Sequence, residues 1–312
     1  MNLLDIIKER SKSFPPGFET TGIQAVMLHI ERAETYWERA KHESDIVLFT
    51  DVIYRTNQAF EGMLKEAYSV LAEKKPSRIA PHKIEEYLSD AGLFKERVLS
   101  AFTNYRTEWR NKSTHDYTLF FSEQEALLAI NSVSAFCVIL LDQIVTKANK
   151  IYERERAKLL SEQVKSSIDN YNSLNLSDRA KWLLVKSYEY IDIPQPHLLR
   201  ELEFLGLLSG FIEAVDTTIK VQTDVLLNSK TRARADLILA DEHEKVIVEL
   251  KRTLHQYNSS ALNQLMSHMD LSETKYGIIM SFDGTAKKGE AITQNGLFES
   301  SPKITFIRPT SM

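Results

Sequence analysis

The fold of the carboxy-terminal part of the chain is decided by two short runs, Arg232-Ala-Arg-Ala-Asp236-Leu-Ile-Leu-Ala240 and Val246-Ile-Val-Glu249-Leu-Lys251-Arg252. Both runs are rich in branched apolar residues, and the polar stretch between them is turn-like, which predicts a β-hairpin. Successive side chains of a strand alternate between its two faces. Glu249 and Lys251 are therefore expected on one face of the second strand, about 6–7 Å apart along the backbone.

Charged side chains on a largely apolar strand are costly to bury unless a partner neutralises them. A divalent metal between Asp236 and Glu249, with Lys251 facing a substrate phosphate, would pair all three. Mg²⁺ is typically held by one or two carboxylates together with water and substrate oxygens. In phosphodiester hydrolysis the cation polarises the phosphoryl oxygen, and a lysine stabilises the developing charge. The alternative is an edge strand whose Glu249 and Lys251 face water.

Asp236 followed by Glu249-Leu250-Lys251 resembles the catalytic core of the PD-(D/E)xK nuclease superfamily. The sequence departs from the motif at Ala235, where the motif has proline. The resemblance implies a restriction-endonuclease-like mixed sheet flanked by helices. It also implies Asp236 and Glu249 as ligands of Mg²⁺ or Mn²⁺, Lys251 as a catalytic residue, and DNA as the expected substrate.

The sequence downstream continues the α/β pattern. Apolar residues at helical spacing predict a helix over 258–271, and apolar runs predict strands over 276–281 and 304–308. Several branches of the superfamily carry a glutamine near the metal site, so Gln264 in this helix is a candidate catalytic residue. Its alternative is a surface amide.

The resemblance also implies an acidic residue on the first helix of the nuclease fold. A helix is predicted over 197–215, and it carries Glu201, Glu203 and Glu213. Helix surfaces are rich in solvated glutamate, so the sequence alone does not choose among the three.

The amino-terminal part is predicted to be entirely helical. From Gly22 to Ile151 the apolar spacing is helical, and no run alternates like a strand. Helices are expected over 25–41 and 45–72. A long helix is expected from Ser122 through Leu141, because Ser122 is a preferred capping residue followed by glutamates in the first turn.

A second candidate site is Trp109-Arg110-Asn111-Lys-Ser-Thr-His115, at the junction of two predicted helices. An arginine binds phosphate bidentately, and an imidazole moves the proton of an RNA 2′-hydroxyl. This stretch resembles the Arg-x(4–6)-His motif of the HEPN superfamily, over roughly residues 45–142. The resemblance implies metal-independent RNA cleavage by Arg110 and His115, and a homodimer through the helical domain. The alternative is a pair of helix-terminal charges near the carbonyl end of a helix.

The composition of the chain limits the number of domains and the classes of function that it can have. The chain has 312 residues, enough for two domains, and 43% hydrophobic and 26% charged residues, as in soluble globular proteins. A net charge of −4 gives no sign of nucleic-acid binding, so a metal or a local basic patch must attract any polyanion. The single cysteine, Cys137, excludes an intramolecular disulfide. No signal peptide, membrane span, Gly-rich phosphate loop or Cys/His zinc cluster is recognised, and a cytoplasmic location is expected.

The sequence therefore predicts a helical HEPN-like domain over 1–155, a helical connector over 156–195, and a PD-(D/E)xK nuclease domain over 196–312. The expected function is metal-dependent cleavage of nucleic acid, DNA before RNA. By analogy, the setting is a prokaryotic defence or toxin system with a partner protein. Two alternatives remain open. One is a HEPN ribonuclease toxin whose carboxy-terminal domain only binds nucleic acid, and the other is an inert dimeric binding module.

Overall fold

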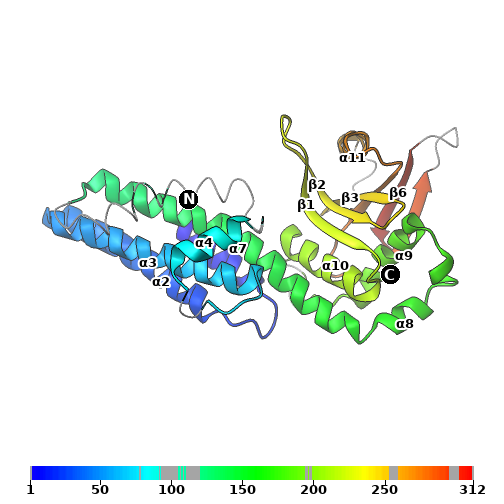
Figure 1. The fold of residues 1–312 in the computed structure, drawn as a ribbon, viewed down its shortest axis with the longest axis horizontal. Coiled ribbons are helices and arrows are strands. Elements are labelled where there is room, and N and C mark those ends of the chain that lie inside the picture. The colour runs from blue at the N-terminus through cyan, green and yellow to red at the C-terminus, as the bar shows by residue number, and fades with distance from the viewer. Residues whose placement is uncertain are drawn as a thin grey trace. The chain divides into compact units, whose positions relative to one another are not determined.

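The computed structural model describes residues 2–76, 79–90, 92, 105, 107, 109, 120–193, 196, 199–252, 259–294 and 302–310. Helices and a six-stranded sheet make up a mixed α plus β protein, as predicted (Figure 1). Backbone contacts divide the chain into two compact units, Met1–Lys147 and Ala148–Met312. The predicted HEPN-like and nuclease domain ranges stay predictions.

In its described part the first unit is built from helices. They are α1 (Leu3–Arg10), α2 (Thr21–Glu43), α3 (Ile46–Leu71), α4 (Pro81–Asp90) and the first part of α7 (Glu123–Lys158). The predicted start of α7 is confirmed by a reciprocal cap. Ser122 N–H donates to Glu125 Oε2 (2.8 Å), and Glu125 N–H donates to Ser122 Oγ (3.3 Å). Such a capping box satisfies backbone donors that the first turn leaves without partners.

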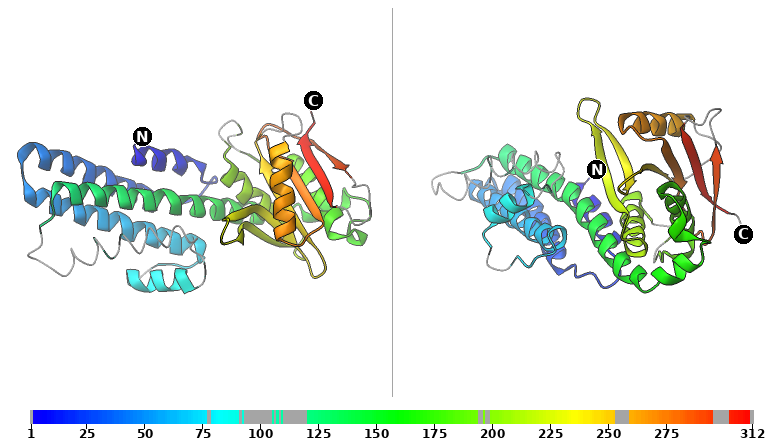
Figure 2. Two further views of the ribbon diagram at one scale, coloured as in Figure 1. Left: turned by 90° about the horizontal axis from the view of Figure 1, so that it is seen from above. Right: turned by 45° about the vertical axis from the view of Figure 1, so that its right-hand side comes forward.

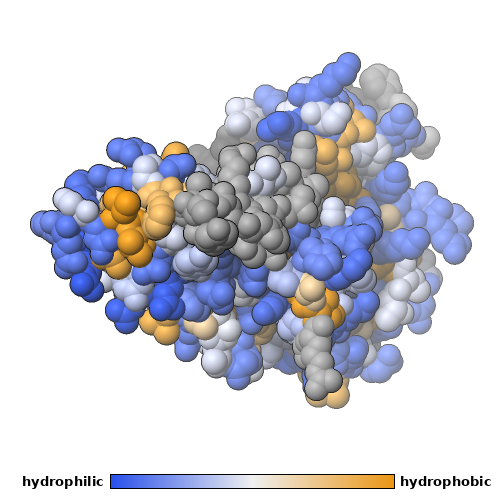
Figure 3. All heavy atoms as spheres, turned by 60° about the vertical axis from the view of Figure 1, so that its left-hand side comes forward, coloured by the Kyte–Doolittle hydropathy of each residue, from blue (hydrophilic) through white to orange (hydrophobic). Residues whose placement is uncertain are grey.

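Hydrophobic residues lie among the hydrophilic ones on the surface of the molecule (Figure 3). The large exposed hydrophobic residues on the α2, α3 and α7 helices of the first unit and beside α7 are Leu28, Ile46, Val47, Tyr54, Phe120, Leu127 and Leu128. Single exposed apolar residues are ordinary on soluble proteins. They nevertheless provide this unit with apolar area that association would bury.

Among the described residues, α7 is the one helix long and apolar enough to cross a membrane by length and composition, and 61% of its apolar window is buried. Core helices of soluble proteins pass the same test. The expected absence of a membrane span therefore stays a prediction.

The second unit is organised around a sheet of order β1-β2-β3-β4-β6-β5. Its strands are β1 (Lys220–Asn228), β2 (Ala233–Ala240), β3 (Lys245–Lys251), β4 (Tyr276–Ser281), β5 (Gly289–Gln294) and β6 (Lys303–Pro309). Strand β3 pairs antiparallel with β2 and parallel with β4, and β4 pairs parallel with β6. The predicted hairpin and the predicted strands over 276–281 and 304–308 are confirmed. The edge strands β1 and β5 were not predicted, because an edge strand is paired on one side only and needs less apolar patterning.

Helices cover both faces of this sheet (Figure 2). On one face, α9 (Leu176–Tyr190) and α10 (Glu201–Val215) share an apolar core with Val246, Val248 and Leu250 of β3. On the other face, α11 (Ser259–Leu271) packs over Ile247. The short helix α8 (Ser161–Ser166) precedes α9. The predicted alternation of β3 is therefore confirmed, and it places Glu249 on the side of α11.

Candidate active site

The candidate site lies where the hairpin strands β2 and β3 separate. Their register runs from Ala240↔Lys245 to Leu237↔Val248. Beyond Leu237 the regular pairing of the two strands ends. There a side chain accepts the next backbone hydrogen bond, since the Leu250 N–H donates to Asp236 Oδ2 (2.8 Å). Buried backbone donors need partners, so Asp236 satisfies this one while its carboxylate stays next to Glu249.

Glu249 is the most deeply buried carboxylate of the site, with 0% of its surface exposed. Burial, and after it the charge of Asp236, raise the pKa of this carboxyl to about 8, although Lys251 acts in the opposite direction. Lys251 Nζ lies 3.6 Å from Glu249 Oε2, beyond ordinary hydrogen-bond distance. Within the described part of the chain, Oε2 has no hydrogen-bond partner. Ionising a buried carboxyl whose Oε2 has no donor is costly, and a cation bound at this oxygen would offset that cost.

Among the three upstream glutamates, the structure brings Glu201 to the site. Its side chain reaches solvent at the start of α10, yet partial desolvation, followed by the charge of Asp236, raises its pKa, while Lys251 lowers it. The other two are engaged elsewhere. Glu203 accepts the Arg200 N–H in the helix cap (3.4 Å), and Glu213 pairs with Lys150 (2.6 Å).

Helix α11 contributes a residue that the sequence did not single out. His268 is 5% exposed, and its Nδ1 lies 2.7 Å from Glu249 Oε1. Gln264, one turn earlier, is exposed. Residues four apart share one face of a helix, so the spacing between Gln264 and His268 was the available signal. The role of Gln264 stays a prediction.

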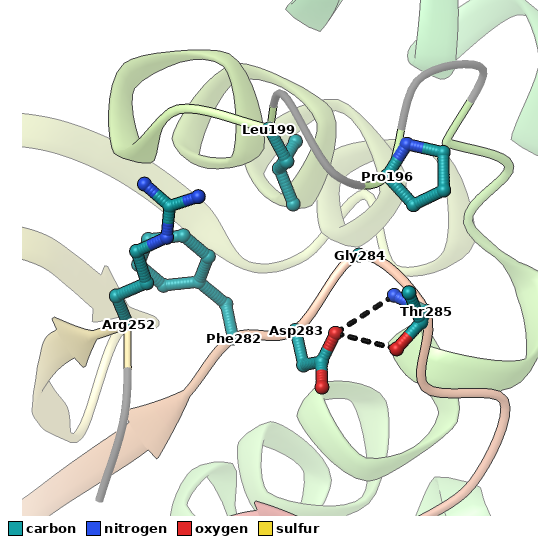
Figure 4. Close-up of a pocket in the computed structure, with 7 residues that line it drawn as sticks. All are labelled: Pro196, Leu199, Arg252, Phe282, Asp283, Gly284 and Thr285. Carbon is teal, nitrogen blue, oxygen red and sulfur yellow. Dashed lines mark hydrogen bonds between the residues drawn. The ribbon is translucent and has the colours of Figure 1, made fainter.

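A pocket of about 240 Å³ adjoins the end of β3 (Figure 4). Its wall includes Arg252, directly after Lys251, and the segment Phe282–Thr285 after β4. The Phe282 N–H donates to the Lys251 carbonyl (2.9 Å), which ties this wall to the candidate site. Arg252 is exposed and provides a positive charge beside Lys251.

The donor set fits a hard divalent cation. Two carboxylates, Asp236 and Glu249, come together with a buried oxygen that lacks a donor. In the described ranges no group of three or more His, Cys, Asp or Glu side chains is arranged to hold a metal. Mg²⁺ and Mn²⁺ accept such a sparse carboxylate set because water and substrate oxygens complete their coordination, whereas structural zinc sites need four protein ligands.

The candidate ribonuclease residues Arg110 and His115 lie outside the described residues. Comparisons with models of known protein families, with curated proteins and with solved structures found no match to this chain.

Proposed function

We propose that the unit Ala148–Met312 hydrolyses phosphodiester bonds of nucleic acid, with DNA as the expected substrate and Mg²⁺ or Mn²⁺ as the cofactor. One observation carries the proposal. The carboxylate of Glu249 is fully buried between Asp236 and Lys251, and its Oε2 has no hydrogen-bond partner among the described residues. Displaced pKa values in a cluster of charged groups are typical of functional sites.

Each residue of the cluster has a role in this chemistry. Asp236 and Glu249 would hold the cation, which would act as a Lewis acid on the phosphoryl oxygen. Lys251, with 28% of its side chain exposed, presents an ammonium group to the substrate phosphate and stabilises the charge that develops there. Glu201 adds a carboxylate at the solvent side, and Arg252 offers a second cation for a flanking phosphate.

The fold supports the same proposal. An antiparallel hairpin that carries the acidic residues, followed by parallel strands and covered by helices on both faces, resembles the restriction-endonuclease-like architecture. A HEPN-like first unit and a role in a prokaryotic defence or toxin system rest on analogy alone, because fold does not determine function.

The test uses the purified full chain with labelled DNA and RNA, in Mg²⁺ or in chelator. Asp236→Ala and Glu249→Ala are expected to abolish Mg²⁺-dependent cleavage. The matched control, Glu242→Ala, removes an exposed carboxylate from the turn of the same hairpin and is expected to cleave normally. Full activity of both site variants would overturn the proposal.

The same assay separates the alternatives. Cleavage of RNA that survives chelator and is lost in His115→Ala would assign the activity to the HEPN-like motif, whose chemistry needs a 2′-hydroxyl and no metal. Absence of any cleavage and of any bound Mn²⁺ would support an inert binding module.

A further inference from the structure

His268 occupies an unusual place for a polar side chain. It lies in the apolar layer between α11 and the sheet, which includes Ala261, Leu265 and Met269 of the same helix. Its ring is buried, with Nδ1 at 2.7 Å from Glu249 Oε1. A leucine or methionine would fill this volume without the cost of burying a polar ring. The hydrogen bond to Glu249 is therefore the feature that distinguishes histidine here.

The two oxygens of Glu249 have different surroundings. Oε1 has the imidazole of His268, whereas Oε2 has no hydrogen-bond partner in the described part of the chain and faces Lys251 Nζ at 3.6 Å. Rotation of a carboxylate about its last torsion is soft. A donor fixed to Oε1 by a packed helix therefore determines which oxygen turns towards Asp236 and Lys251.

The contact itself shows which ring nitrogen would donate. A carboxylate that binds a cation is ionised and can only accept hydrogen bonds. The ring nitrogen within hydrogen-bond distance of Glu249 Oε1 is Nδ1, so Nδ1 is the donor of this contact.

We infer that His268 is a positioning residue for metal binding: its Nδ1–H donates to Glu249 Oε1 and holds the carboxylate so that Oε2 binds the cation. The inference rests on the proposed function. Ligating carboxylates are commonly hydrogen-bonded by such outer partners, and loss of the partner typically lowers metal affinity about 10–100-fold.

The test measures Mn²⁺ affinity of the full chain by titration calorimetry, with no nucleic acid present. His268→Leu is expected to raise the Kd for Mn²⁺ about 10–100-fold. His268→Asn is expected to restore most of the affinity, because the asparagine amide nitrogen occupies nearly the place of Nδ1. His268→Gln places its nitrogen near Nε2 instead and is expected to bind as weakly as the leucine variant.

Met269→Ala is the packing control. This buried neighbour on α11 belongs to the same apolar layer and is expected to lower thermal stability while it leaves the Kd within about twofold of the wild type. Circular dichroism of each variant verifies folding, and the Asn and Gln pair decides the matter if the leucine variant does not fold.

The outcomes separate the two proposals. If wild type binds Mn²⁺ and Glu249→Gln does not, but the Leu and Gln variants of His268 bind like wild type, the positioning role is overturned and the metal site stands. The positioning role is also overturned if Asn binds as weakly as Gln. If wild type and Glu249→Gln bind Mn²⁺ equally, or neither binds, the metal site itself is overturned, and the role of His268 with it.

Discussion

Replacement of Glu249 by glutamine is expected to stabilise the metal-free protein while it removes the metal site. Glutamine has nearly the same shape but no charge to bury. The carboxyl of Glu249 has an ordinary pKa of 4.5, and burial, assisted by Asp236, raises its pKa to about 8. The folded state therefore holds a proton over a pH range in which the unfolded chain has already released it.

The sign follows from proton linkage. Between pH 4.5 and about 8 the folded state binds more protons than the unfolded state, so this group lowers the stability of the protein as pH rises. Below pH 4.5 the effect is absent, and above pH 8 it is complete. At about 1.4 kcal/mol per pH unit, the upper limit at pH 7 is about 3.5 kcal/mol. Because a glutamine amide does not reproduce every contact of the carboxyl group, the glutamine variant is expected to gain less than this limit, about 1–3 kcal/mol at pH 7 and under about 1 kcal/mol at pH 5.

Amide hydrogen exchange in chelator measures this difference in the second unit alone. Peptides that cover β4 (Tyr276–Ser281), which pairs with β3 and contains no substituted residue, report the free energy of opening the sheet, and comparison at equal pH cancels their intrinsic exchange rate. Glu242→Gln, which changes an exposed carboxylate of the adjacent turn, is the control and is expected to match wild type at both pH values. A glutamine variant of Glu249 that is less protected than wild type at pH 7, or that differs from it equally at pH 5 and pH 7, would refute the reasoning.

Three further predictions follow from the same contacts. Glu201→Gln is expected to reduce Mg²⁺-dependent cleavage about 10–100-fold, clearly more than Glu203→Gln or Glu213→Gln. Steady-state rates at saturating substrate measure the difference, and equal losses in all three variants would contradict the choice of Glu201. Gly210→Ala is expected to destabilise the second unit by about 1–3 kcal/mol, because a Cβ there would lie 2.3 Å from the Lys150 carbonyl oxygen. An unchanged denaturant midpoint would argue against this close helix approach. Light scattering is expected to give about twice the chain mass of 35.8 kDa, through association of the helical unit, and a monomer at micromolar concentration would count against a dimer.

The sequence by itself determined the central part of the site. A two-residue period places Glu249 and Lys251 on one face of β3, and a turn-like break places Asp236 on the neighbouring strand. Both signals are local, since they depend on the geometry of a strand and of a short turn. The long helices α2, α3 and α7 followed from their apolar spacing for the same reason.

Only the tertiary structure decided what surrounds these residues. His268 and Glu249 are 19 residues apart, and their contact depends on how α11 crosses the sheet, which no local period encodes. The same holds for Glu201. In the sequence it is indistinguishable from Glu203 and Glu213, and only the packing of α10 brings its carboxyl within the influence of Asp236 and Lys251. Periodicity reports the face on which a side chain lies. The packing of distant elements decides what lies opposite that face, and this determines the burial, the charge and the pKa of Glu249.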